Sequence, residues 1–464
     1  MKLLTFFIPY ATIIIMNDYL RQEPIVLKRP HDLDDIDFSN VFERYLDDPS
    51  SAAKYINNTS ERQYLYWDKA QYSEPIPGFT ATESWALAHQ LRQLVSKPTP
   101  IKSEHGDIFK YHRMNYIDEA LRNIDMHAGG LLLSGEPSQS VEPQRQKYLV
   151  RGIVEEAISS SQLEGADTSS RYAKKMLAEN IKPRNKSDQM ILNNYLVMQQ
   201  IEQKHKDDPL SIALLRELQS ELVHKTLSSE YTAGEFRRDT DDVIVSYDDK
   251  IAHVPPSASF VAGELERLVA YANDDTEFVH PVIKAIQLHF WLGYLHPFPD
   301  GNGRLARAVF YWYLFRHGYW AMAYLPISNL LKRSPKNYTY AYIYSEQDSH
   351  DFTYFLDFHL KTILKAIDKF KEYVDQKASE GTSIIATISA KYPTLNYRQV
   401  SALHHLLNDD RNYTSAKSYS MLNAITRRTA YSDLKELKDL GLVNTETVSQ
   451  VTHYFASDKL KGLF

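Results

Sequence analysis

The stretch His296-Pro297-Phe298-Pro299-Asp300-Gly301-Asn302-Gly303-Arg304-Leu305-Ala306-Arg307 decides the fold of this 464-residue chain. It follows an apolar run at helical spacing, 282–295, and precedes a second run, 305–315, that is apolar nearly all round. Two prolines and two glycines between the runs predict a tight turn. The pattern predicts two packed helices whose connection brings a histidine, a carboxylate and main-chain N–H groups to one place.

The start of the second predicted helix suits an anion. Gly-Asn-Gly at a helix N-terminus leaves unpaired N–H donors, which favour a group such as phosphate. Arg304 and Arg307 lie three residues apart in the first turns, so both can add charge-assisted contacts to phosphate oxygens. A phosphate-binding loop is therefore predicted.

Every defining position of this stretch matches His-x-Phe-x-(Asp/Glu)-Gly-Asn-Gly-Arg-x-x-Arg, the signature of the Fic family, which the chain resembles over residues 111–372. The resemblance implies a mainly α fold, with a helical Fic-fold core and a β-hairpin flap. It also implies a protein adenylyltransferase, which transfers AMP from ATP, with Mg²⁺, to Ser, Thr or Tyr hydroxyls of target proteins and of itself. The implied nucleotide-binding residues are Phe298, Gly301, Asn302, Gly303, Arg304, Arg307 and Tyr338.

The chemistry of that reaction assigns roles within the signature. His296 is its only side chain that takes up a proton near neutral pH, so we expect it to be the general base. Asp300 is a hard oxygen ligand suited to Mg²⁺. Asn302, with the neighbouring N–H groups, would stabilise developing negative charge. Members of the family that phosphorylate their targets tend to carry Lys at the position of Gly303, so phosphorylation is disfavoured for this chain.

An acidic helix end lies upstream of the signature. A helix is predicted over 142–165, where Ser160 and Glu164 share a face and Gly165 is a helix stop. The segment resembles the family's inhibitory motif, (Ser/Thr)-x-x-x-Glu-(Gly/Asn). The resemblance implies that Glu164 pairs with Arg307 and blocks productive binding of the γ-phosphate. It also leaves open that Glu164 activates water and removes AMP.

Two β-branched runs around a polar turn predict a hairpin over 243–254, which Pro255 terminates. A hairpin of purely structural importance is one interpretation. The hairpin also resembles the family's flap, which holds a target segment by main-chain pairing. The flap residues so implied are Val243, Ile244, Val245, Ile251 and Val254.

Composition sets broad limits. The chain is 43% hydrophobic and 24% charged, with a net charge of −6, so it has no general attraction to nucleic acid or membranes. It has no cysteine, which excludes thiol chemistry and fits a reducing compartment. Met1–Ile15 is apolar but short and broken by Pro9, and we interpret it as an upstream extension of a cytoplasmic protein. No membrane association is expected.

The predicted domains are an accessory region 1–110, the Fic-like domain 111–372, a linker 373–395 and a winged helix-turn-helix 396–464. Helices are expected at 399–407, 420–425 and 426–440, with the wing at 443–455. Residues 411–440 carry six Lys/Arg and three Asp/Glu, so Arg427 and Arg428 could contact DNA. DNA binding through 396–460 and a protein-interaction role stay open.

Two alternatives to the adenylyltransferase function remain at this stage. The chain could be a DNA-binding transcriptional regulator with a nucleotide-responsive Fic module. It could be a Fic enzyme that uses another nucleotide donor. A homodimer also stays open, because nothing in the sequence decides the oligomeric state.

Overall fold

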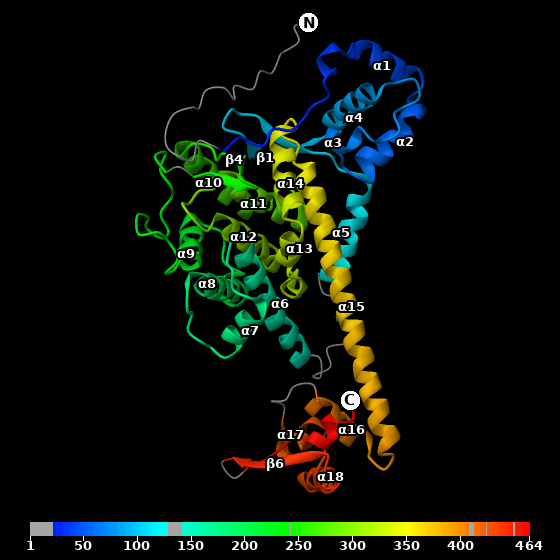
Figure 1. Ribbon diagram of the computed structural model, residues 1–464, viewed down its shortest axis with the longest axis vertical. Coiled ribbons are helices and arrows are strands. Elements are labelled where there is room, and N and C mark those ends of the chain that lie inside the picture. Colours follow the sequence, from blue (N-terminus) through cyan, green and yellow to red (C-terminus); the bar gives the residue numbers. More distant parts are fainter. Residues whose placement is uncertain (1–21, 129–141, 242, 408–412, 424, 449–450) are drawn as a thin grey trace. The chain divides into compact units, whose positions relative to one another are not determined.

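The computed structural model describes residues 22–128, 142–241, 243–407, 413–423, 425–448 and 451–464 (Figure 1). The chain divides into two compact units, Met1–Asp368 and Lys369–Phe464. Both consist mainly of α-helices with small antiparallel sheets of two or three strands, which confirms the predicted mainly α fold. Among the described helices, none has the length and apolar character needed to cross a membrane. The prediction for Met1–Ile15 lies outside the described residues.

The N-terminal part of the first unit packs on the helices that follow the signature. Its elements are α1 Phe38–Asp47, α2 Ala53–Ile56, α3 Trp67–Ala70, α4 Ala81–Val95, β1 Lys97–Lys102, β2 Ile108–Tyr111 and α5 Asn115–Ala128. Strand β2 is tied to the residue before α15 (Thr353–Lys391), because the Phe352 N–H donates to the Lys110 carbonyl at 2.7 Å. The Tyr64 hydroxyl donates to buried Asp351 at 2.5 Å. Residues before 110 therefore belong to the same compact unit as the signature.

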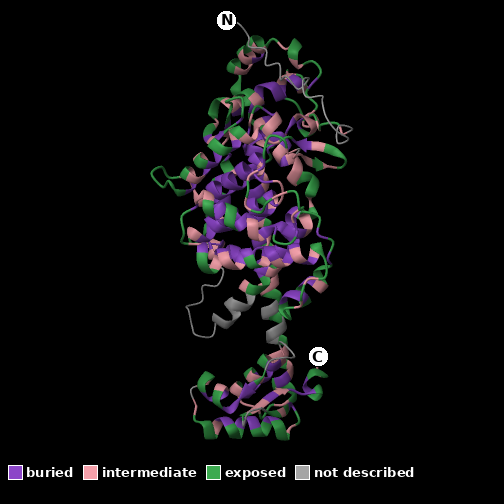
Figure 2. Cartoon of the chain, turned by 90° about the vertical axis from the view of Figure 1, so that its left-hand side faces the viewer, coloured by how far each residue is buried: buried purple, intermediate pink, exposed green. Residues whose placement is uncertain are grey.

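The helical core surrounds the pair of helices that the sequence predicted. Its elements are α6 Glu142–Leu163, α7 Ser170–Ala178, α8 Lys186–Gln200, α9 Ile212–Leu222, β3 Val245–Tyr247, β4 Lys250–His253, α10 Ala258–Asn273, α11 Pro281–Leu295, α12 Asn302–Arg316, α13 Ile327–Arg333 and α14 Pro335–Gln347. Helices α11 and α12 pack against each other and are buried along nearly their whole length. Figure 2 shows this buried interior. Helices α11 and α12 are central because they carry apolar residues on every face.

A short N-terminal strap, residues 22–27, runs along the outer edge of strand β4. The Ile251 N–H donates to the Glu23 carbonyl at 3.0 Å, and the Ile25 N–H donates to the Ile251 carbonyl at 2.8 Å. Gln347, the last residue of α14, holds the strap through the Leu27 N–H and the Ile25 carbonyl. The β3–β4 hairpin therefore has one edge covered by the chain itself.

Helix α15, Thr353–Lys391, occupies most of the predicted linker. A linker was predicted over 373–395, and the helix continues through most of this range to Lys391. The segment is polar, yet it contains only one glycine and no proline before Pro393, so no residue stops the helix. Polarity alone did not distinguish a linker from a solvent-exposed helix.

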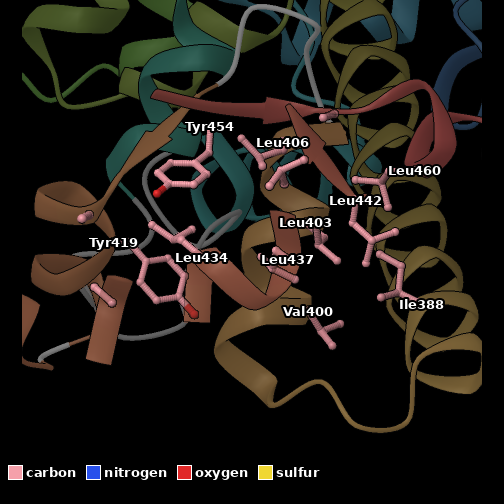
Figure 3. Packing of buried hydrophobic residues seen from close by; sticks show 14 residues of the cluster. Ile388, Val400, Leu403, Leu406, Tyr419, Leu434, Leu437, Leu442, Tyr454 and Leu460 are labelled. Carbon is pink, nitrogen blue, oxygen red and sulfur yellow. The ribbon is translucent and has the colours of Figure 1, made fainter. Parts of the chain in front are cut away.

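The second unit has the element order helix–strand–helix–helix–strand–strand. These elements are α16 Tyr397–Leu407, β5 Thr414–Ser415, α17 Ala416–Leu422, α18 Arg427–Asp439, β6 Val443–Val448 and β7 Val451–Ala456, followed by α19 Asp458–Lys461. The second helix begins four residues earlier than predicted, because Ser415 caps it through the Ser418 N–H. The buried core of the second unit contains Leu403, Leu434 and Leu437 (Figure 3).

Candidate functional site

The connection between α11 and α12 is held in one conformation by two left-handed residues and an asparagine brace. His296 closes α11 with φ 45°, and Gly301 begins α12 with φ 87°, a conformation that favours glycine. The Asn302 side chain accepts from the Phe298 N–H at 2.9 Å and donates to the Phe298 carbonyl at 2.6 Å. The loop is therefore rigid before any ligand binds.

This bracing modifies the role predicted for Asn302. Its amide oxygen and one amide hydrogen are engaged by Phe298, and the side chain is buried. Only its second amide hydrogen is left for a developing charge. The main-chain N–H groups in the first turn of α12 are the more direct anion donors, because a helix leaves them unpaired.

His296 has the tautomer that a general base requires. Its Nδ1 lies 2.7 Å from the Gly293 carbonyl, which can only accept, so Nδ1 carries the proton and Nε2 keeps a free lone pair. Burial lowers the pKa of His296 to about 4, below its usual value. The imidazole is therefore neutral at physiological pH and able to take up a proton.

Arg237 holds the main chain around His296. Its Nε donates to the His296 carbonyl at 2.7 Å, and its own N–H donates to the Pro297 carbonyl at 2.9 Å. The guanidinium also donates to the carbonyls of Pro256 and Leu295. No local pattern singles out Arg237, because it lies 59 residues before His296, its main partner.

Asp300 and Arg304 form a pair on the first turn of α12. Asp300 Oδ1 accepts from the Gly301 N–H at 2.6 Å and from Arg304 Nη2 at 3.3 Å. Arg304 is 1% exposed and also donates to the Leu222 carbonyl at 2.8 Å. Asp300 keeps 41% of its side-chain surface exposed, and its Oδ2 makes no hydrogen bond to another described residue.

Arg307 is bound by the two residues that the sequence singled out on α6. Its Nε donates to Ser160 Oγ at 2.8 Å, and its Nη2 donates to Glu164 Oε1 at 2.8 Å. Burial alone would raise the pKa of Glu164, but the Arg307 charge outweighs it and holds that pKa below its usual value. The pair is therefore fully ionised at neutral pH.

The Glu164 carboxylate lies over the glycine where an anion would approach. A methyl group placed on Gly303 would come within 2.2 Å of Glu164 Oε1 and within 3.2 Å of Arg307 Nη1. The carboxylate thus stands against the N-terminus of α12 and beside its second arginine. An anionic ligand that uses both features would have to displace it.

Part of the chain is similar to a known protein family. Residues 209–314 match the Fic/DOC family. The matched range begins before α9 and ends inside α12, so this Fic/DOC domain includes the β3–β4 hairpin and the signature. Helix α6 and the second unit lie outside it.

Curated relatives carry an activity in their names. The protein adenylyltransferase Fic of Culex quinquefasciatus is 32% identical over 124 residues, which are 26% of this chain and 22% of that protein. The protein of the same name from Drosophila melanogaster is also 32% identical over 124 residues, 26% of this chain and 23% of its own. The chain spans less than a quarter of the length of these relatives.

Two solved structures are similar to the chain. A Fic family protein from Desulfovibrio desulfuricans has 16% identity and a TM-score of 0.48, covering 73% of this chain and 96% of its own. A fragment of Fic-1 from C. elegans has 16% identity and a TM-score of 0.47, covering 77% and 90%.

Helix α6 docks on the Fic/DOC domain through residues spaced four apart. Besides Ser160 and Glu164, this face carries Glu156, whose carboxylate accepts from Tyr311 at 2.9 Å and from the Ser328 N–H at 3.0 Å. Burial raises the pKa of Glu156. Glu156 was not among the predicted site residues, although its spacing from Ser160 and Glu164 is a signal that it shares their face.

Gly152 lies on the same face of α6 and allows the helix to pack closely against the main chain at Ala323 and Tyr324. A Cβ at this position would lie 2.0 Å from the Ala323 carbonyl oxygen and 2.7 Å from Tyr324 Cα, both main-chain atoms. We expect Gly152→Ala to lower the free energy of unfolding by about 1–3 kcal/mol, because the backbone must shift to admit the methyl group. Urea denaturation measures this.

A matched glycine provides the control for that prediction. Gly263 lies inside helix α10, and a Cβ there meets nothing within 4 Å. Gly263→Ala should be neutral or stabilise the fold by up to about 1 kcal/mol, because alanine favours the helix. Equal effects of the two substitutions would contradict a close α6 contact at Gly152.

The predicted flap residues do not all lie in strands. Val245 is in β3 and Ile251 in β4, whereas Val243 and Ile244 precede the hairpin and Val254 follows it. Asp248 and Asp249 form the turn, both with positive φ, as a two-residue hairpin of type I′ requires. The paired hairpin is therefore shorter than the predicted 243–254.

Tyr338 lies on α14 beneath Arg307. Its hydroxyl is 2.9 Å from His289 Nε2, and its ring stacks on Phe358 with centroids 6.1 Å apart. Burial raises the pKa of Tyr338, although the neighbouring Arg307 charge opposes this. The structure brings Tyr338 close to the signature, but it engages the hydroxyl with a buried histidine.

Proposed function

We propose that this chain is a protein adenylyltransferase that transfers AMP from ATP to a hydroxyl group of a protein, and that Glu164 keeps it inactive. One observation carries the proposal. In the loop that precedes α12, His296 is neutral with a free Nε2, and the Glu164 carboxylate occupies the space over Gly303 where an anion would bind. The names of the partial relatives support the reaction type.

Each residue of the loop has a separate role in the proposed reaction. A target hydroxyl attacks the α-phosphorus of ATP, its proton passes to His296 Nε2, and pyrophosphate leaves with the electrons of the broken P–O bond. Main-chain N–H groups of Asn302 and Gly303 would face the charge that develops on the phosphoryl oxygens. Arg304 and Arg307 would bind the β- and γ-phosphates once Glu164 is displaced.

Asp300 fits the magnesium ion that such reactions use. Its exposed Oδ2 makes no hydrogen bond to a described residue, and one or two carboxylates with phosphate oxygens are a common Mg²⁺ environment. Among the described residues no group of three or more His, Cys, Asp or Glu could hold a metal by itself. The ion would neutralise phosphate charge, and Asp300 would hold it against the loop.

The flap offers one edge to a target segment. Within the described part of the chain β3 pairs only with β4, whose other edge is covered by the strap. An extended target segment would therefore add to β3, next to Val245, unless the strap leaves. Main-chain pairing of this kind requires little of the target sequence.

The test compares two labels on ATP. The Glu164→Gly chain is incubated with Mg²⁺ and with ATP labelled at the α- or the γ-phosphate, and labelled protein is measured. Adenylyl transfer places the α-label on the protein and leaves the γ-label in pyrophosphate. Transfer of the γ-label instead would show phosphorylation and contradict the proposal, and other labelled nucleotides would test a different donor.

Two alternative functions make different predictions. Glu164 could activate water and remove AMP, in which case the unsubstituted chain, but not Glu164→Gly, would release AMP from labelled protein. The second unit could make the chain a DNA-binding regulator, since Arg427 and Arg428 are exposed at the N-terminus of α18. Salt-dependent binding to DNA without any protein labelling would favour the regulator.

A further inference from the structure

His253, the last residue of flap strand β4, lies buried between two acceptors. Its Nδ1 is 2.7 Å from Glu346 Oε2 on α14, and its Nε2 is 2.7 Å from the Tyr294 carbonyl on α11. A carbonyl oxygen can only accept, and an ionised carboxylate can only accept. Both ring nitrogens must then carry protons, so the geometry makes His253 an imidazolium ion.

The electrostatics agree with that assignment. Burial alone would lower the pKa of His253, and the nearby Arg237 charge acts in the same direction. The Glu346 carboxylate and the Tyr294 carbonyl outweigh them, and the pKa lies above its usual value. The direction of this shift favours the protonated ring, as the two hydrogen-bond partners do.

His253 belongs to a set of donors that cap the C-terminal end of α11. The carbonyls of residues 293–296 accept in turn from His296, from His253 and, for the last two, from Arg237. The last carbonyls of a helix have no partners within the helix, and cations are favoured there. Because His296 is the next residue of this helix end, its position depends on these caps.

We propose that His253 is a positioning residue for His296: an imidazolium that fastens the flap to the end of α11 and keeps a positive charge beside the base. The two rings lie 6.4 Å apart between centroids. The other charged or titratable groups around His253 are Glu346 on α14, Tyr294 on α11 and Arg237 before the flap. This inference rests on the proposed function only for its effect on rate.

A cation at this distance makes protonation of His296 less favourable. It adds to the burial that already lowers the pKa of His296 to about 4. Without the charge, and with the flap less firmly held, the His296 pKa should rise toward its usual value. Part of the base would then be protonated, and inactive, in mildly acidic buffer.

The first test follows histidine titration by NMR of ¹⁵N-imidazole-labelled protein, with peaks assigned by single substitutions. We expect both His253 nitrogens to stay protonated at pH 7.5, and His253→Gln to raise the His296 midpoint by up to about one pH unit. This measurement needs no enzymatic activity, so it stands even if no label is transferred. A neutral His253 at pH 7.5, or an unchanged His296 midpoint, would overturn the proposal.

The second test measures labelling in the Glu164→Gly background. His253→Gln and Glu346→Gln should lower the ratio of the rate at pH 5.5 to that at pH 8, whereas the parent ratio stays near one. His89→Gln is the control, since His89 on α4 is a half-buried histidine whose Nε2 lies 3.0 Å from the Asp348 carboxylate. Equal pH profiles for His253→Gln, Glu346→Gln and His89→Gln would contradict the proposal and leave His253 with a structural role alone. No label in the parent itself would contradict the proposed function alone.

Discussion

Glu164→Gly should increase incorporation of the α-label from ATP by roughly 10- to 100-fold over the unsubstituted chain. The substitution removes a charge-assisted hydrogen bond to buried Arg307, worth about 1.5–3 kcal/mol, with which the γ-phosphate must compete. It also clears the space over Gly303. Initial rates of self-labelling, at equal protein and ATP concentrations, measure the effect.

Two further variants separate release of Arg307 from general loosening of α6. Glu164→Gln keeps the side-chain size but loses the charge, so we expect an intermediate gain. Glu155→Gly weakens the same helix, yet Glu155 pairs with Lys174 and not with the signature, so no gain is expected. An increase with Glu155→Gly as large as with Glu164→Gly would argue against a specific Glu164–Arg307 block.

The Arg307 side chain should keep its position when the Glu164 side chain is removed. Breaking a buried pair usually costs about 3–5 kcal/mol, but Glu164 keeps 32% of its side-chain surface exposed, which reduces that cost. Two hydrogen bonds from Arg307 to Ser160 also remain. The gain in labelling is therefore expected without unfolding, which a thermal melt of the variant can check.

The sequence predicted those parts of the site that depend on local spacing. The turn between two apolar helices, the glycine-initiated α12 and the shared face of Ser160 and Glu164 all follow from residues within one or two helical turns. The same local rule would also have found Glu156 and Gly152. Their role needs the positions of Ser328 and Ala323, which lie more than 150 residues away.

Contacts between distant segments account for what the sequence did not predict. The strap on β4, Arg237 on the His296 carbonyl and His253 between α11 and α14 each join segments far apart in the chain. None of these residues breaks a local pattern, so nothing marked them. The length of α15 was missed for the opposite reason, since a polar composition suits both an exposed helix and a linker.

In the activated Glu164→Gly background, His296→Ala should reduce labelling by about 100- to 10,000-fold, the usual contribution of a positioned general base. The structure gives this residue a neutral ring, a fixed tautomer and a helix end held by several hydrogen bonds. Alanine removes the proton acceptor together with the hydrogen bond from Nδ1 to the Gly293 carbonyl, whereas the main-chain bonds at 296 and the Asn302 brace are retained. Affinity for ATP should therefore change little.

His280→Ala is the matched control, since His280 caps the other end of α11 through its side chain. It should cost some stability but leave labelling within a few-fold of the parent. A His296→Ala rate within tenfold of the parent would mean that another group, or water, takes the hydroxyl proton. Loss of ATP binding together with labelling would instead make His296 a residue that shapes the loop, and the proton acceptor would have to be sought elsewhere in the site.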